Sequence, residues 1–163
     1  MAKKAKEEKT NVMRLLEQAK VEYSHYCYAD TDAISGVEVA TVLGQNVDKV
    51  FKTLVTVGKS KEHYVFVIPV AEELDLKKAA KSVGEKSISM LPSKELLPVT
   101  GYIHGGCSPI GMKKSFPVVI DSSAGDFSSI IFSAGKIGYQ VEVTIGDLVT
   151  LLSCNFANVV EEK

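Results

Sequence analysis

The sequence predicts an α+β fold in a single domain, with a mixed sheet flanked by helices. Segments with helical spacing of apolar residues and segments rich in β-branched residues follow one another without a strict strand–helix–strand alternation. The chain of 163 residues has the usual length of one domain. We divide it into a charged, frayed N-terminal segment, residues 1–9, and a single domain, residues 10–163.

Two helices are predicted near the N-terminus. Apolar residues at helical spacing predict the first over residues 10–20. The second begins at Ser35, because a serine followed three residues later by Glu38 is a capping box. Gly44 is expected to end this helix, and its inner face would hold the apolar residues Val39, Val42 and Leu43.

Strands are predicted where β-branched and aromatic residues gather between turn signals. The clearest pair is Val50–Val57 and Tyr64–Val70, which the polar turn GKSKEH joins as a hairpin. Further short strands are predicted at Tyr23–Tyr28, residues 86–90, Pro117–Asp121, Ser129–Ser133 and Tyr139–Val143.

The second half of the chain combines further helices with a long loop. Asp75 is expected to cap a helix that runs to Val83, with Gly84 as its stop. A short helix is predicted at Ser93–Leu97 and a last one from Thr144 to about Cys154. Residues 98–116 are rich in Gly, Pro and Ser and predict a loop whose length is typical of a functional segment.

Bulk composition excludes several classes of function. The formal net charge is −1, so a polyanion would have to be met by a local patch. Cys27, Cys107 and Cys154 are widely spaced, which indicates a reducing compartment and no zinc site. The charged N-terminus lacks the apolar region of a signal peptide, and no apolar run is long enough to span a membrane. We therefore predict a cytoplasmic protein without metal or cofactor.

Lys52 is the first candidate site residue. It interrupts an apolar strand, where a period of two places it on one face with Val50, Leu54 and Thr56. A lysine at such a position either prevents association at a sheet edge or lines a pocket. In a pocket, its ammonium would offer three donors and a positive charge to a hydroxyl or carbonyl oxygen. The residue pattern favours the edge and leaves both roles open.

The segment Thr100–Lys114, TGYIHGGCSPIGMKK, is the second candidate. Its glycines, Gly105 and Gly106 among them, allow a positive φ and a close approach of the backbone to a ligand. Backbone N–H groups in such a loop can hold an oxyanion, although a tight structural loop fits the pattern equally. A second glycine turn, SAGKIG at Ser133–Gly138, could face the same pocket, although its pattern favours an ordinary hairpin turn.

Cys107 invites a different interpretation, as the nucleophile of a peptidase. Such a cysteine needs an activating base or a cationic environment. His104 stands only three residues away, but nearness in sequence does not establish contact. The pattern favours an inert, buried thiol.

An ordered set of motifs resembles the YbaK family. The set spans about residues 10–158 and consists of KVFKTLV (49–55), VIPVAEELDLKKAAKSVGEK (67–86), TGYIHGGCSPIGMKK (100–114), IDSSA (120–124), SAGKIG (133–138) and GDL (146–148). The resemblance implies a mixed sheet curled into a partly open barrel and flanked by helices, as in the editing domain of bacterial prolyl-tRNA synthetase. It also implies a trans-editing deacylase that removes cysteine from tRNA(Pro) and, less selectively, from other tRNAs.

The resemblance carries over to individual residues. Lys52 matches the essential lysine of the family, and Gly105 matches the glycine of its GGxSP loop, whose backbone helps hold the substrate. Ser133 matches the serine that opens the S(A/G)GK turn, and Tyr28 matches a pocket tyrosine. We therefore predict Lys52 and Gly105 as catalytic residues and expect the substrate to contact Tyr28, Ser35, Gly106, Ser108, Ser133 and Gln140.

Two positions depart from the family pattern. Ser35 stands where the best-known members have a pocket phenylalanine, and Gln140 stands where some members carry aspartate. These departures bear on the amino acid that the pocket accepts. They keep open a sibling editor that acts on Ala-tRNA(Pro) through an attacking water.

In the implied reaction the enzyme supplies no nucleophile. The thiol of the substrate's own cysteine attacks its ester carbonyl and releases a cyclic thiolactone, while Lys52 and loop N–H groups position the ester. Two alternatives of another class remain: a non-catalytic module that docks on a tRNA or a synthetase, and the peptidase that would use Cys107.

The implied partners are a mischarged tRNA and prolyl-tRNA synthetase, the latter in a ternary complex. We predict contacts of tRNA with Lys113, Lys114 and Lys136. Together with these three, a single basic rim for the acceptor stem could include Lys77, Lys78 and Lys81.

Overall fold

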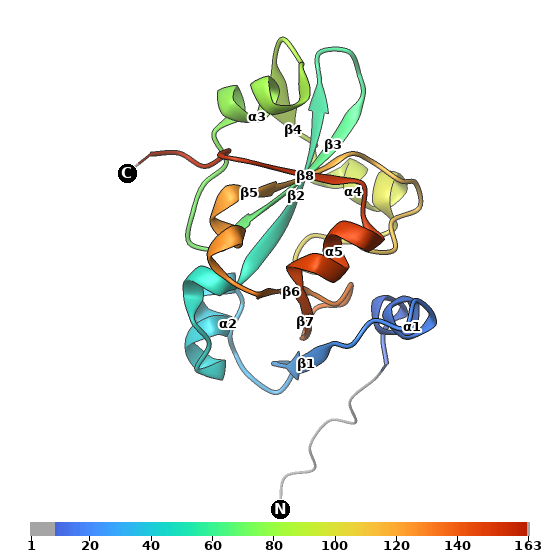
Figure 1. Ribbon diagram of the computed structural model, residues 1–163, viewed down its shortest axis with the longest axis vertical. Helices are drawn as coiled ribbons and strands as arrows, with labels where there is room; N and C mark the ends of the chain where they lie inside the picture. The colour runs from blue at the N-terminus through green and yellow to red at the C-terminus, as the bar shows by residue number, and fades with distance from the viewer. Residues whose placement is uncertain (1–8, 163) are drawn as a thin grey trace, which may run out of the picture.

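The structure is a computed structural model that describes residues 9–162 (Figure 1). Of the predicted N-terminal segment 1–9, residues 1–8 lie outside the described residues. The elements follow one another as α1 (Asn11–Gln18), β1 (Ser24–Cys27), α2 (Gly36–Leu43), η1 (Val47–Lys49), β2 (Phe51–Gly58), β3 (His63–Pro69), α3 (Leu76–Val83), β4 (Ile88–Met90), α4 (Ser93–Thr100), β5 (Val118–Asp121), η2 (Ser122–Asp126), β6 (Ser129–Ser133), β7 (Tyr139–Thr144), α5 (Ile145–Leu151) and β8 (Cys154–Ala157).

The strands form two sheets. One is antiparallel with the order β1-β7-β6, and the other is mixed with the order β4-β2-β3-β5-β8, in which β3, β5 and β8 run parallel. A single bridge between Val50 and Ile131 links them, and the described strands do not close into a barrel. The predicted α+β fold with a partly open, mixed sheet and flanking helices is confirmed, although its strands divide between two sheets.

Both faces of the five-stranded sheet are covered. Phe51 and Val55 of β2 face the main core, which includes Val12 and Leu16 of α1. The opposite face packs a second cluster in which Phe66 and Ile68 of β3 meet Ala79 and Ala80 of α3. This double burial explains why the strand VFVIP is a continuous apolar run. It also places α1 and α3 on opposite sides of the sheet.

The predicted caps and stops of α2 and α3 are confirmed, whereas α1 spans Asn11–Gln18 instead of all of residues 10–20. Ser35 and Glu38 form the reciprocal capping box of α2, and the Asp75 carboxylate accepts the N–H groups of Lys77 and Lys78 at the start of α3. Gly44 and Gly84 follow these helices with φ of 67° and 75°. The inner-face assignment of Val42 is wrong, because its side chain is 54% exposed while α2 buries Val39 and Ala40.

The end of the chain differs from the sequence prediction. The last helix stops at Leu151 instead of continuing to Cys154, and Cys154–Ala157 form β8, which pairs with Val118–Asp121. Helix α4 runs on to Thr100 with Pro98 inside it, so the long loop begins at Gly101. No helix within residues 9–162 has the length and apolar character needed to cross a membrane.

Candidate functional site

A pocket of about 300 Å³ opens between the two sheets. Its walls come from β2, the loop before α2, the β4–α4 connection, the glycine loop after α4 and the ends of β6 and β7. Segments that are far apart in sequence therefore meet here. The pocket brings together six of the predicted site residues: Tyr28, Ser35, Lys52, Gly105, Ser133 and Gln140.

Lys52 lies where β2 has a neighbouring strand on one side only. Along one side it is paired with Ile68 of β3. On the other side, β4 pairs with β2 only at Thr56–Gly58, and the bridge to β6 is made at Val50. The N–H of Leu91 also donates to the carbonyl of Val55, so the open stretch of edge is Phe51–Leu54, which is a wall of the pocket. The edge and the pocket, which the sequence offered as alternatives for Lys52, are thus the same place.

The ammonium of Lys52 is available to a ligand. Its side chain is partly buried, and no described residue makes a hydrogen bond or ion pair with it. Thr53 follows it in the pocket wall, and its buried Oγ1 also has no hydrogen-bond partner among the described residues. The sequence analysis missed Thr53. Its position next to the lysine, on a strand whose edge is open, is the signal that could have found it.

The glycine loop forms another wall of the pocket through His104, Gly105 and Cys107. Gly105 has a φ of 87°, a conformation that favours glycine. A side chain at Gly106 would meet the backbone nitrogen of Ile137 at 3.2 Å, so the loop packs directly on the turn between β6 and β7. That turn also holds the end of β1, because the N–H of Tyr28 donates to the carbonyl of Gly138 over 2.7 Å.

Three polar residues of the pocket are held by local hydrogen bonds. Ser35 Oγ accepts the backbone N–H of Glu38, and Ser133 Oγ accepts that of Gly135. Each hydroxyl keeps its own hydrogen for donation to a ligand. Gln140 is 5% exposed, and its Oε1 accepts a 2.8 Å hydrogen bond from Gln45 Nε2. Its amide orientation is therefore fixed from outside the pocket.

Cys107 and His104 also line the pocket. Cys107 is only 8% exposed, and burial raises the pKa of its thiol to about 12. The sulfur is consequently protonated at neutral pH, whereas nucleophilic attack requires the thiolate. This argues against the peptidase interpretation.

The remaining predicted residues lie outside the pocket lining. Ser108 is fully buried and its Oγ accepts the N–H of Ile110 within the loop. Gly106 is behind the lining, and Lys136 lies over the ring of Tyr139, with its Nζ 5.4 Å from the centroid. Lys113 and Lys114 belong to the loop beside α1, because a side chain at Gly111 of this loop would meet Leu15 and Asn11 of α1.

The single basic rim of six lysines is wrong. Lys77, Lys78 and Lys81 belong to α3, which covers the face of the five-stranded sheet opposite α1. The loop with Lys113 and Lys114 lies on the α1 side. These two groups of lysines therefore cannot contact one stretch of tRNA as a continuous row.

Comparison with known proteins agrees with this geometry. Residues 31–151 match the family model described as an aminoacyl-tRNA editing domain. Over the full length of both chains, the sequence is 48% identical to an Enterococcus faecalis protein named as a Cys-tRNA(Pro)/Cys-tRNA(Cys) deacylase, EbsC. It is also 29% identical to a proline–tRNA ligase of Pelobacter propionicus over 108 residues, which are 66% of this chain and 19% of the ligase.

A solved structure shares the fold. A crystal structure described as a trans-editing enzyme for prolyl-tRNA synthetase superposes with a TM-score of 0.80 at 25% identity, covering 93% of this chain and 95% of the other. The resemblance that the ordered motifs indicated is confirmed. This chain belongs to the aminoacyl-tRNA editing domain family.

Proposed function

We propose that this protein is a trans-editing deacylase that clears cysteine from mischarged Cys-tRNA(Pro) and from other Cys-tRNAs. The observation that carries the proposal is the ammonium of Lys52, which has no partner among residues 9–162 and lines the same pocket of about 300 Å³ as Gly105 of the glycine loop. The full-length identity of 48% with a protein named as a deacylase of such tRNAs supports this choice of substrate.

In the proposed complex, the 3′-terminal aminoacyl-adenosine enters the pocket. The Lys52 ammonium donates a hydrogen bond to an oxygen of the ester or the ribose, and backbone N–H groups near Gly105 hold the ester carbonyl. Ser35 and Ser133, which line the pocket and whose hydroxyls retain a hydrogen to donate, also contact the substrate. These contacts fix the reacting groups at short distance, which is a large part of the rate gain in such reactions.

The nucleophile in this mechanism is the substrate thiol. Its sulfur bonds to the ester carbonyl carbon, the bond from that carbon to the ribose oxygen breaks, and the thiol proton ends on the ribose hydroxyl. The products are a cyclic thiolactone and a tRNA with a free 3′ end. Because proline has no thiol, this chemistry spares correctly charged Pro-tRNA(Pro), which size alone would not exclude.

A second candidate, hydrolysis of Ala-tRNA(Pro) by water, is favoured by one observation. Thr53 Oγ1 is buried in the pocket wall without a hydrogen-bond partner among the described residues. A bound water could satisfy this oxygen and attack the ester. Gln140, where some family members carry aspartate, would then select the side chain.

Prolyl-tRNA synthetase is the partner that we propose for selecting the tRNA. A chain with a formal net charge of −1 has little long-range attraction for RNA and gains from a partner that holds the tRNA. The similarity of this chain to part of a proline–tRNA ligase supports the association. The proposed substrate implies a cytoplasmic location, and contacts of tRNA with Lys113, Lys114 and Lys136 stay a prediction.

Deacylation of a panel of charged tRNAs with identification of the product tests this function. We expect rapid loss of cysteine from Cys-tRNA(Pro), slower loss of alanine from Ala-tRNA(Pro) and none of proline from Pro-tRNA(Pro). Thiolactone as the first product supports attack by the substrate thiol, and free alanine as the main product would favour the second candidate. A protein that binds these tRNAs but leaves all of them charged would be the non-catalytic module.

A further inference from the structure

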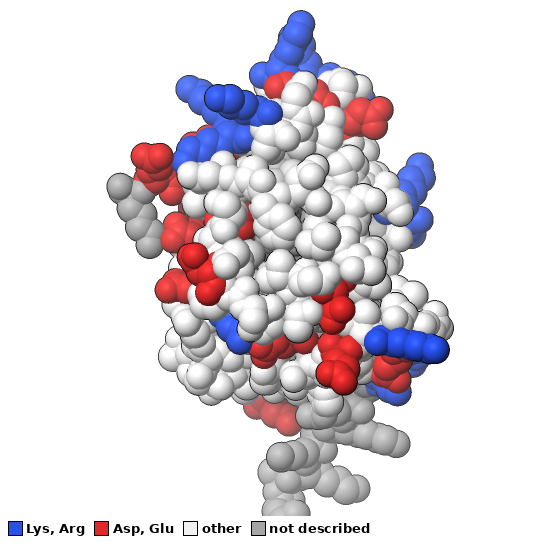
Figure 2. All heavy atoms as spheres, viewed as in Figure 1, with Lys and Arg blue, Asp and Glu red and all other residues white. Residues whose placement is uncertain are grey.

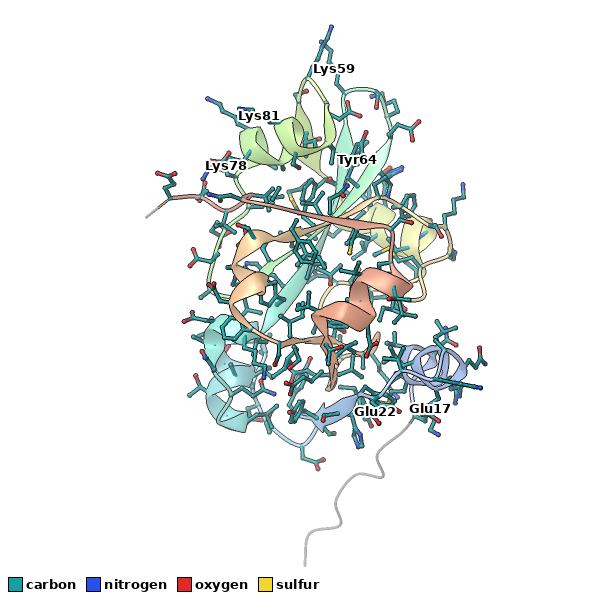
Figure 3. The ribbon with its side chains drawn as sticks, in the orientation of Figure 1. Glu17, Glu22, Lys59, Tyr64, Lys78 and Lys81 are labelled. Carbon is teal, nitrogen blue, oxygen red and sulfur yellow. The ribbon has the colours of Figure 1, made fainter. Side chains whose placement is uncertain are left out.

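A basic groove lies beside α3, away from the pocket. It has a volume of about 480 Å³ and is lined by Lys77 and Lys81 of α3 and by Lys86 of the segment that leads into β4. Lys59 stands next to it, because its backbone N–H donates to the carbonyl of Ser87 over 3.0 Å. In Figure 2, Lys and Arg atoms gather over this end of the molecule, and Figure 3 shows Lys59 and Lys81 extending from it into solvent.

The lysines of this groove are not fully neutralised within the described structure. Lys77, Lys81 and Lys86 are exposed and have no ion pair among the described residues, whereas Lys78 is 3.5 Å from Glu162. The groove lining includes one carboxylate, that of Glu85. Ser60 and Tyr64 donate hydrogen bonds to it, and these bonds, that of Ser60 first, lower the pKa of Glu85. These neutral donors keep Glu85 ionised, so its charge offsets one of the three lysines. Three lysines against one carboxylate leave the groove lining with a net charge of +2, which favours an anionic ligand.

Strand β4 connects this groove to the pocket. Ile88 lines the groove and Met90 lines the pocket, and residues two apart on a strand point to the same face. Ile88 pairs with Gly58, and Thr56, on the face of Lys52, pairs with Met90. Because Gly58 lies six positions after Lys52 along β2, the groove lies about 20 Å from Lys52. A few nucleotides of extended single strand span that distance.

We propose that the groove formed by Lys77, Lys81 and Lys86 binds backbone phosphates of the acceptor strand of the tRNA. The inference rests on the proposed function, which puts the terminal adenosine in the pocket. The nucleotides that precede it then run along β4, and their phosphates meet the groove lysines. Lysines act there as point charges, so the contact carries no sequence information and adds affinity for any tRNA.

The test compares two double variants that remove equal charge. Lys77→Ala/Lys81→Ala alters the groove. The control, Arg14→Ala/Lys20→Ala, removes two exposed cations in and just after α1, which lies across the sheet from α3 and holds none of the predicted tRNA contacts. Binding of an uncharged RNA hairpin with the tRNA(Pro) acceptor stem and its single-stranded 3′ end is measured at several salt concentrations. Deacylation is measured with full-length Cys-tRNA(Pro) and with the cysteinyl ester of adenosine, which has no phosphate to reach the groove.

We expect the groove variant to bind the hairpin roughly tenfold or more weakly at 0.1 M salt, with the slope of log K against log salt reduced by about 1.4. Its KM for Cys-tRNA(Pro) should rise while kcat, and all values for the adenosine ester, stay as in the wild type. The Arg14→Ala/Lys20→Ala variant should keep the wild-type slope.

Hairpin binding by the groove variant with wild-type affinity and slope overturns the proposal, and so does an equal loss for both double variants. Hairpin binding is measured without catalysis. The groove proposal and the proposed deacylase function can therefore be contradicted independently of each other. A wild-type protein that leaves Cys-tRNA(Pro) charged contradicts the proposed function. A groove variant that still loses hairpin binding in that case supports the groove as an RNA-phosphate site.

Discussion

Lys49 and Lys52 are three residues apart in sequence, yet one is part of an ion pair within the fold and the other lines the pocket. Lys49 ends a short 3₁₀ helix, and its Nζ lies 2.6 Å from Glu142 Oε2 at the junction of the two sheets. Lys52 lies on β2 with no ion pair among the described residues, at the wall of the pocket. A lysine neutralised by the fold contributes to stability, whereas a lysine left without a counter-charge is available to a ligand.

The carboxylate of Glu142 organises the first of these two regions. Its Oε1 accepts a 2.6 Å hydrogen bond from Tyr26 of β1, and its Oε2 accepts a 2.5 Å bond from Ser129 of β6. Burial by itself would raise the pKa of Glu142, but the bonds from Lys49, Ser129 and Tyr26 outweigh it and lower the pKa to about 2. This cluster therefore ties all three strands of the smaller sheet to the start of β2.

The largest expected effect separates the two lysines directly. Lys52→Ala should reduce kcat/KM for Cys-tRNA(Pro) by about 10²–10³-fold, the usual loss when one electrostatic stabiliser is removed. Its thermal midpoint should stay near that of the wild type, because the ammonium has no partner in the described fold to lose. Lys49→Ala should lower the thermal midpoint, because Glu142 loses its ion-pair partner, and should leave kcat/KM close to that of the wild type. A fully active Lys52→Ala variant would remove this residue from the mechanism.

Gly105→Ala tests the glycine loop of the pocket and should reduce activity more than stability. At a φ of 87°, an alanine costs about 1–2 kcal/mol, and relaxing this strain would displace the loop N–H groups. We expect at least a tenfold fall in kcat/KM with a moderate loss of stability. Gly125→Ala is the control, since a methyl group there would meet nothing within 4 Å. Equal activity of both variants would contradict a role for the Gly105 backbone.

Glu142→Gln tests the cluster around Glu142 without altering the pocket lining. The substitution leaves the Lys49 ammonium without its counter-charge, at a site where the Glu142 side chain is 17% exposed. We expect the free energy of unfolding, measured with urea at pH 7, to fall by about 1–3 kcal/mol. The activity of the folded fraction should remain within a few-fold of wild type. A variant as stable as the wild type would mean that the cluster contributes no net stability.

Acid should reduce the stabilising contribution of the Glu142 cluster. The folded-state pKa of Glu142 is about 2, below its ordinary value of 4.5, so its contribution is fully present above pH 4.5 and is lost as the pH falls from 4.5 toward 2. Unfolding free energies measured at pH 5 and pH 3 should therefore differ less in Glu142→Gln than in the wild type. An identical pH dependence of the two proteins would show that other carboxylates account for the acid sensitivity.

Cys107→Ala should have the smallest effect on catalysis. The thiol is protonated at neutral pH because burial raises its pKa to about 12, and the proposed mechanism does not use it. We expect kcat/KM for Cys-tRNA(Pro) to change less than about threefold, with a small loss of stability from the vacated volume. Loss of activity in a folded Cys107→Ala variant would revive the cysteine nucleophile.

Much of the local structure could be predicted because its causes lie within a few residues. The cap of α3 at Asp75 depends on N–H groups two and three residues away, and the Ser35–Glu38 box closes over three residues. Strand β8 could not be predicted in this way. Its residues continue the apolar end of α5, and they become a strand by pairing with β5, more than thirty residues earlier.

The sequence by itself determined the α+β class, most of the element positions and the family motifs that single out Lys52 and Gly105. Only the tertiary structure decided that Lys49 is neutralised by Glu142, that Lys52 is not, and that the α3 lysines lie across the sheet from Lys113 and Lys114. The physical reason is the range of the forces involved. Capping and turn formation are satisfied locally, whereas the partner of a charge and the open edge of a strand depend on how distant segments pack.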